Sequence, residues 1–209
     1  MADPIQGVIR SPLFSGQPTS FAANEKQEQL VAFGIPPYAE MARKGYGFGT
    51  MSVTAVAALV VRPTTTAAFE IFNGYASGGK SLIIDRLFWF NLVSTAVNEG
   101  WSGWAQVTAA KAAVSSGSFV VRGNTGKSYG GPVIAAAGTT VIDSGWFPWT
   151  NQITSSGAGV TPYGCAVVDV GGRLIVPPQC SLCLHVVASV VGQTFTQGAQ
   201  WYEEQLTIE

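Results

Sequence analysis

The stretch from residue 81 to residue 94 reads SLIIDRLFWFNLVS, and it decides the fold class of this chain. Alternate side chains of a β-strand point to opposite sides, so a strand built from these residues has two apolar faces. One face carries Leu82, Ile84, Phe88, Phe90 and Leu92. The other face carries Ile83, Leu87, Trp89 and Val93.

An antiparallel sandwich needs only the inner face of each strand to be apolar. This strand is therefore either central and covered on both sides, or its outer face is a subunit interface. We expect the interface, because an apolar sheet face left open to water marks a site of protein association. The expected interface residues are Ile83, Leu87, Trp89 and Val93.

Short strand-like segments continue along the rest of the chain, and glycine-rich or proline-rich turns separate them. The expected strands are residues 51–62, 66–73, 81–94, 101–108, 118–122, 132–141, 164–170, 173–177, 181–191 and 200–208. Many short strands at this spacing predict an all-β fold, and we expect a jelly-roll β-sandwich.

Residues 1–50 lack this strand pattern and predict an N-terminal arm, whereas residues 51–209 predict the sandwich domain. Three prolines within residues 1–23 favour an extended segment. An arm without a core of its own becomes ordered by docking onto another surface.

One or two short helices are expected within the arm. Asn24 can cap a helix that runs to about Phe33. A second helix is expected over Pro37 to Lys44, since Gly45 can supply a left-handed end. The glycines between Gly45 and Gly49 then predict a loop.

Charged side chains are scarce, at 11% of the 209 residues, and the formal net charge is −1. A typical soluble domain has about 25%. Between Glu99 and Glu203 the charged residues are Lys111, Arg122, Lys127, Asp143, Asp169 and Arg173. So few charges leave little material for acid–base catalysis and do not steer the protein to nucleic acid. They favour association with other protein.

The chain has no apolar run of the roughly 18 residues that a membrane helix needs. Residues 1–10 do not have the pattern of a signal peptide. Three cysteines, an odd number, argue against a disulfide framework. We therefore expect folding in a reducing cytoplasm and no membrane partner.

Residues 74–81 read GYASGGKS and match the phosphate-loop pattern G-x-x-x-x-G-K-[ST]. A phosphate loop needs a helix that begins at its lysine. The residues after Lys80 are β-branched and aromatic, so we interpret the motif as a glycine-rich hairpin turn between two strands.

Residues 126–130 read GKSYG and match the nucleophile-elbow pattern, with Asp143 or Asp169 and then His185 in the order of a serine hydrolase. An elbow needs a helix directly after Ser128, and the following glycines and proline oppose one. Adjacent strand residues Glu203 and Glu204 point to opposite faces, so they cannot act as a glycosidase pair. We expect no catalytic residues.

Cys180, Cys183 and His185, together with Cys165, raise the question of a zinc site. Strand alternation places Cys183 and His185 on one face and Cys180 on the other side or in the preceding turn. We therefore expect small buried cysteines and neither a metal nor a cofactor.

Residues 146–149 read WFPW and form the most loop-like group of aromatic side chains. Aromatic rings in an exposed loop can stack on a sugar or anchor a receptor. Trp146, Phe147 and Trp149 are therefore the candidate contacts of a ligand-binding module.

Two regions resemble jelly-roll structural proteins in the virions of tailed phages and related environmental viruses. The first contains RPTTTA at 62–67, NG at 73–74 and GGKSLIID at 78–85. The second contains GRLIVPP at 172–178, LHVV at 184–187, TF at 194–195 and WYEE at 201–204. The resemblance covers about residues 38–205. It implies a capsid-associated subunit, such as a decoration (cement) protein, which is typically an oligomer and has no catalytic residues.

The sequence patterns and the resemblance to virion proteins lead to the same expected function. The expected protein is a non-enzymatic capsid decoration protein of a bacteriophage virion, made in the host cytoplasm. It would form a homo-oligomer, with a homotrimer favoured, and clamp the major capsid protein through its N-terminal arm. The alternative is a carbohydrate- or receptor-binding β-sandwich module of a phage spike or fibre.

Overall fold

The computed structural model describes residues 8–9, 19–20, 37–93, 99–109, 117–154 and 164–206. It divides the chain into two units, Met1–Pro36 and Pro37–Glu209. In the first unit, β1 (Val8–Ile9) and β2 (Thr19–Ser20) pair antiparallel. The helix expected at residues 24–33 lies outside the described residues.

The second unit begins with α1 (Pro37–Arg43), which confirms the second expected helix. Gly45 follows with φ +80, and the Gly45 amide donates to the Ala42 carbonyl at 2.9 Å. Helix α1 packs against β3 (Gly47–Met51), so both belong with the sandwich. The boundary between the units therefore falls at Pro36, not at the expected residue 50.

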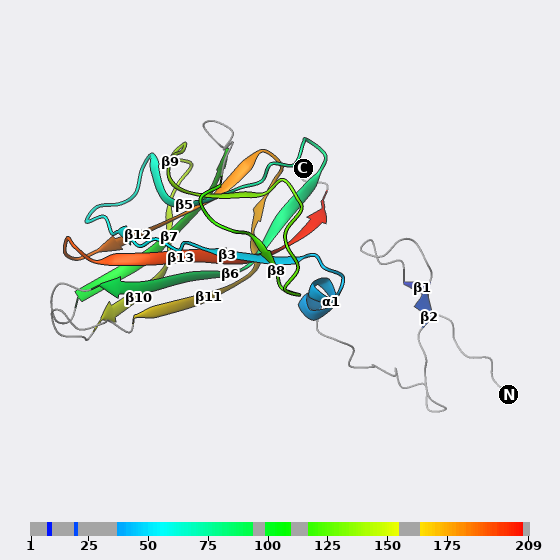
Figure 1. Cartoon of the computed structure of the whole chain (residues 1–209), viewed down its shortest axis with the longest axis horizontal. Helices are drawn as coiled ribbons and strands as arrows, with labels where there is room; N and C mark the ends of the chain where they lie inside the picture. The colour runs from blue at the N-terminus through cyan, green and yellow to red at the C-terminus, as the bar shows by residue number, and fades with distance from the viewer. Residues whose placement is uncertain are drawn as a thin grey trace, which may run out of the picture. The chain divides into compact units, whose positions relative to one another are not determined.

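The sandwich consists of two antiparallel sheets, which we name sheet I and sheet II (Figure 1). Sheet I has the order β11 (Cys165–Val176), β6 (Lys80–Val93), β13 (Thr194–Gln205), β3 and β8 (Arg122–Gly123), with β4 (Val56–Ala57) also paired to β13. Sheet II has the order β10 (Phe147–Thr154), β7 (Glu99–Ala109), β12 (Cys180–Ala188), β5 (Thr66–Phe72) and β9 (Ile134–Thr140).

Eight principal strands follow the order of a jelly roll. Strands β3, β6, β11 and β13 form sheet I, whereas β5, β7, β10 and β12 form sheet II. The first and last of these strands in the chain, β3 and β13, are neighbours in sheet I. The second and the second-to-last, β5 and β12, are neighbours in sheet II. This nested pairing is that of two Greek keys folded together. The predicted all-β sandwich is confirmed.

Some strand predictions were wrong because pairing partners override local signals. Strand β10 was expected to be a loop, but it forms an edge strand by pairing with β7. The loop expected from Gly45 to Gly49 is largely β3, which is held by β13. In the expected strand 51–62, strand β4 covers two residues only. The last strand begins at Thr194 and not at residue 200.

Glycine-rich connections also differ from expectation. Gly171 and Gly172 have φ of +57 and +81, yet they form a bulge inside the single strand β11 and do not separate two strands. The Gly74–Gly79 connection does join two strands, but β5 and β6 lie in opposite sheets. It is therefore a crossover between the sheets and not a hairpin turn.

A bulge at Asp85 reverses the faces of β6. Trp201 pairs with Ile84 whereas Gln200 pairs with Arg86, so β6 has one extra residue between these pairs. One inserted residue moves every later side chain to the other face. The inward residues of β6 are consequently Leu82, Ile84, Leu87, Trp89 and Asn91.

The core lies between the inner faces of the two sheets, and Trp89 is one of its fully buried residues. Its indole has no exposed surface and packs against the backbone of Gly103 on the opposite sheet. A Cβ built at residue 103 would lie 2.5 Å from the indole ring. Glycine at this position therefore sets how closely β6 and β7 approach.

Buried amides tie the sheets together at the sandwich ends. The Asn73 side chain, which has no exposed surface, donates to the carbonyls of Lys80 at 2.9 Å and Val176 at 3.0 Å. Asn91 donates to the side-chain oxygen of Gln193 at 2.9 Å. These bonds satisfy the side-chain N–H groups of Asn73 and Asn91, which would be costly to bury without an acceptor.

We predict that Gly103→Ala lowers the free energy of unfolding by about 1–3 kcal/mol, because the new methyl group overpacks the Trp89 ring. Gly100→Ala is the matched control in the same strand, where the nearest atom to the new Cβ is the Gln152 carbonyl oxygen at 4.0 Å. Urea denaturation at a fixed protein concentration measures both. Equal stability of the two variants would contradict this account of the core.

Candidate functional site

The outer face of sheet II is covered by the chain's own residues. Trp146 is 4% exposed and packs with Ala67, Val141 and Cys183. Its indole nitrogen donates to the Thr64 carbonyl at 2.8 Å. Trp146 was expected to contact a ligand, and that expectation is wrong because the ring fills a second small core.

Hydrogen bonds hold this cover in place. The Gln106 side chain donates to the Ile142 carbonyl at 3.0 Å and accepts from the Ser144 amide at 2.9 Å. Arg62 forms a bidentate pair with Asp143 at 2.8 and 2.9 Å. The hydrogen bond from Arg62 holds the pKa of the Asp143 carboxyl below its usual value.

The other two expected ligand contacts lie in the edge strand β10. Phe147 is 67% exposed. Trp149 is partly buried, and the Arg173 guanidinium lies 5.6 Å from its ring centroid. Arg173 also donates to the Val170 carbonyl at 2.9 Å, which stabilises the bulge in β11. The three residues thus do not form one exposed aromatic cluster.

Sheet I, in contrast, leaves apolar side chains exposed on its outer face, beside the exposed ion pair of Arg86 and Asp169. Val167, Phe88, Gly198 and Met51 lie directly opposite one another across β11, β6, β13 and β3. We call these residues the apolar row. Val167 is 53% exposed and Met51 is 41% exposed. Phe88 lies half-buried between them.

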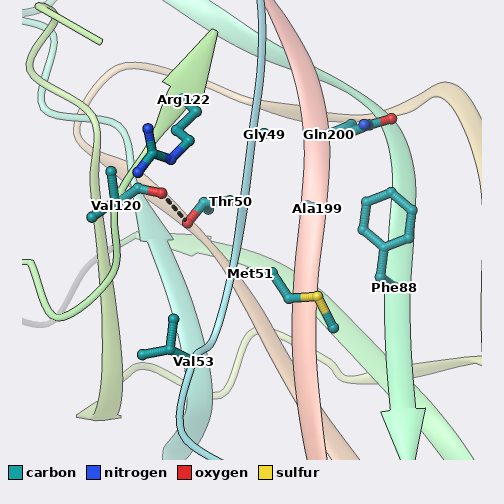
Figure 2. Close-up of a pocket in the computed structure, with 9 residues that line it drawn as sticks. All are labelled: Gly49, Thr50, Met51, Val53, Phe88, Val120, Arg122, Ala199 and Gln200. Carbon is teal, nitrogen blue, oxygen red and sulfur yellow. Dashed lines mark hydrogen bonds between the residues drawn. The ribbon is translucent and has the colours of Figure 1, made fainter. Parts of the chain in front are cut away.

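A groove of about 480 Å³ runs beside this row. Figure 2 shows Phe88 on one side of it and Val120 and Arg122 on the other, with Met51 projecting across β13. The Thr50 hydroxyl donates to the Val120 carbonyl at 3.0 Å, which fixes the wall opposite Phe88. Val120 itself is 64% exposed. The groove is mainly apolar, and Arg122 provides its charge.

The expected interface residues divide between core and surface. Leu87 and Trp89 have no exposed surface, so their assignment to an interface is wrong; the bulge at Asp85 turns them inward. Ile83 lies half-buried opposite Ile175, and Val93 is 48% exposed at the end of β6. Phe88, which the sequence assigned to the face of Leu82 and Ile84, points outward instead.

A second feature is a polar pocket of about 350 Å³ at the end of the sandwich where β6 begins. Glu203 points into it with a side chain that is only 2% exposed. The Tyr129 hydroxyl donates to Glu203 Oε1 at 2.7 Å, and the Tyr75 hydroxyl donates to Oε2 at 2.8 Å. Lys80 Nζ lies 3.9 Å from Oε2.

This pocket unites residues from the two motif matches. Lys80 begins strand β6, so no helix N-terminus is present there to bind phosphate. Ser128 lines the same pocket. His185 lies on β12, where the Val186 amide donates to its ring, while Asp143 pairs with Arg62 and Asp169 pairs with Arg86. Ser128, His185 and an aspartate are therefore not assembled as a triad.

The cysteines are separate as well. Cys183 is buried, and burial raises the pKa of its thiol, whereas Cys165 is exposed on the outer face of sheet I. In the part of the chain that the structure describes, no cluster of three or more His, Cys, Asp or Glu residues could hold a metal ion. Among the same residues, no helix has the length and apolarity to cross a membrane.

No family model, no curated protein and no solved structure matches this chain. The argument for a function therefore depends on the two features above: the apolar outer face of sheet I and the polar pocket at Glu203.

We predict that Tyr75 and Tyr129 ionise late in an alkaline titration followed by phenolate absorbance. Burial is the larger cause and the hydrogen bond to Glu203 is the second; together they raise the pKa of Tyr75 to about 12. The same two causes raise the pKa of Tyr129 further. Both pKa values lie above the ordinary tyrosine pKa of about 10. The hydrogen bonds from the two neutral tyrosines to Glu203 therefore contribute their full stabilisation below about pH 10. The stabilisation is lost as pH rises through the folded-state pKa.

Glu203→Gln tests this cause, because a neutral amide no longer disfavours a nearby phenolate. We expect the Tyr75 pKa to fall towards its ordinary value in this variant. An unchanged titration curve would mean that Glu203 does not control these tyrosines.

Proposed function

We propose that this chain is a non-enzymatic structural subunit of a virion, a capsid decoration (cement) protein. It associates with further copies through the outer face of sheet I. The observation that carries the proposal is the contrast between the two sheets. The outer face of sheet II is covered by Trp146 and its neighbours, whereas sheet I presents the apolar row.

A second copy is the occupant that fits this face. Burying apolar surface contributes roughly 25 cal/mol per Å². The charges nearby are already compensated within the chain, since Arg86 bonds Asp169 at 2.8 Å. A closed ring of identical subunits covers the face of every copy, and a trimer is the ring we favour.

The N-terminal unit supports the attachment role. Met1–Pro36 is a unit of its own, distinct from the sandwich unit Pro37–Glu209. Thirty-six residues in extended form span up to roughly 120 Å, enough to reach a neighbouring shell subunit. We assign this unit the role of a strap that holds the major capsid protein.

The binding-module alternative receives less support from Trp146, Phe147 and Trp149. Trp146 is covered, and Trp149 is engaged by Arg173. Phe147 alone gives too small a surface for specific recognition.

We predict that the wild-type chain is an oligomer in light scattering coupled to size-exclusion chromatography. Val167→Glu should weaken its association at least tenfold, because a carboxylate without a partner would be buried in the interface. The matched control is Ile153→Glu on the edge strand of sheet II, where Ile153 is 72% exposed. It should leave the oligomer intact.

A wild-type chain that stays monomeric at high concentration would overturn this assignment. So would an Ile153→Glu variant that dissociates while Val167→Glu does not. Circular dichroism of both variants verifies that the sandwich is folded.

We also predict that deletion of residues 1–23 abolishes co-sedimentation with empty shells of the cognate major capsid protein, while the sandwich still folds. Lys80→Ala and Ser128→Ala should leave shell binding and association nearly unchanged, since both residues line the pocket at Glu203 and not the apolar row. Retained shell binding by the truncated chain would refute the strap.

A further inference from the structure

The proposed assembly through the outer face of sheet I gives no role to the polar pocket at Glu203. Its walls come from four separate parts of the sandwich unit: the start of β3, the connection between β5 and β6, the 123–131 segment, and β13. Its volume of about 350 Å³ lies at the lower end of the range for small-molecule sites. The pocket therefore has room for one small organic group.

The buried carboxylate of Glu203 forms the floor of the pocket and can accept further hydrogen bonds. Each oxygen of Glu203 accepts one tyrosine hydroxyl, from Tyr129 or Tyr75, and a carboxylate oxygen can accept a second hydrogen bond. The Tyr129 hydroxyl also accepts from the Val133 amide at 3.1 Å, which fixes its orientation. The acceptor atoms are thus held rigidly before any ligand arrives.

Lys80 adds donors beside this acceptor. Lys80 Nζ lies 3.9 Å from Glu203 Oε2, which is longer than a hydrogen bond. The N–H groups of Lys80 therefore do not form a hydrogen bond with the carboxylate. Lys80 Nζ also lies 4.9 Å from the ring centroid of Tyr46 and 5.9 Å from that of Tyr75. Its side chain remains 37% exposed at the pocket opening.

Stability alone does not account for this arrangement. A buried carboxylate loses its hydration, so apolar residues of similar volume would often serve folding equally well. The pocket is also kept open by glycine: a Cβ at Gly131 would lie 2.3 Å from the Tyr129 hydroxyl. A larger residue there would displace that hydroxyl from Glu203.

The geometry points to a binding site for one neutral saccharide unit. A sugar hydroxyl can donate to Glu203 and accept from Lys80 at the same time, and the exposed Lys127, which lines the same pocket, can donate to a second hydroxyl. The hydroxyls of Thr125 and Ser128 line the same wall. Tyr46, 41% exposed, supplies apolar surface for the C–H groups of a sugar ring.

The test uses the full chain and saturation-transfer NMR with five sugars: D-glucose, D-galactose, D-mannose, N-acetyl-D-glucosamine and N-acetylneuraminic acid. At least one neutral sugar should bind. Lys80→Met and Glu203→Gln should each weaken that binding at least tenfold. Phe147→Ala, an exposed aromatic residue on the edge of sheet II, should not change it.

Three outcomes would overturn the site: no binding of any neutral sugar, binding of N-acetylneuraminic acid alone, or neutral-sugar binding that both Lys80→Met and Glu203→Gln leave unchanged. Lys80→Met changes a partly exposed side chain, so it keeps the test valid if Glu203→Gln does not fold. Light scattering of Lys80→Met separates the two proposals, because loss of sugar binding with an intact oligomer leaves the assembly role untouched.

Discussion

The bulge at Asp85 is the constraint on which the rest of the structure depends. It lets one strand contribute Leu82 and Ile84 to the core near one end and Trp89 near the other. Without the extra residue, Trp89 would face away from Gly103 and this contact between the two sheets would be lost. The same reversal turns Phe88 to the outside. The core and the apolar outer face of sheet I are therefore two results of one inserted residue.

The fold class could be predicted from the sequence because strand alternation and turn residues are local signals. The bulge could not, although the charged pair Asp85 and Arg86 inside an apolar strand was a signal of irregularity. Strand β10 was missed because Pro148 weakens its strand signal, and only pairing with β7 overcomes this. The two motif matches contain Lys80 and Ser128, but no local signal joins them into a pocket, since Tyr75 and Tyr129 lie 128 and 74 residues from Glu203.

The outer faces of the two sheets differ in how their apolar residues are covered. On sheet II, Gln106 satisfies the backbone of its covering segment, so the cover is held by polar bonds over a small apolar core. On sheet I, the comparable positions are Val167, Phe88 and Met51, and Gly198 between them carries no side chain. A flat apolar strip of this kind is suited to contact with a matching surface, not with water.

The connection between β7 and β10 supplies β8 to the edge of sheet I, β9 to the edge of sheet II, the cover that contains Trp146, and the pocket wall with Tyr129. One continuous segment thus contributes to both halves of the molecule, and its Phe119, Val121, Val133 and Ala135 also belong to the main core between the sheets. A change within this one segment would therefore alter the outer surface, the pocket and the main core together, because Phe119 stacks on Phe69 in that core.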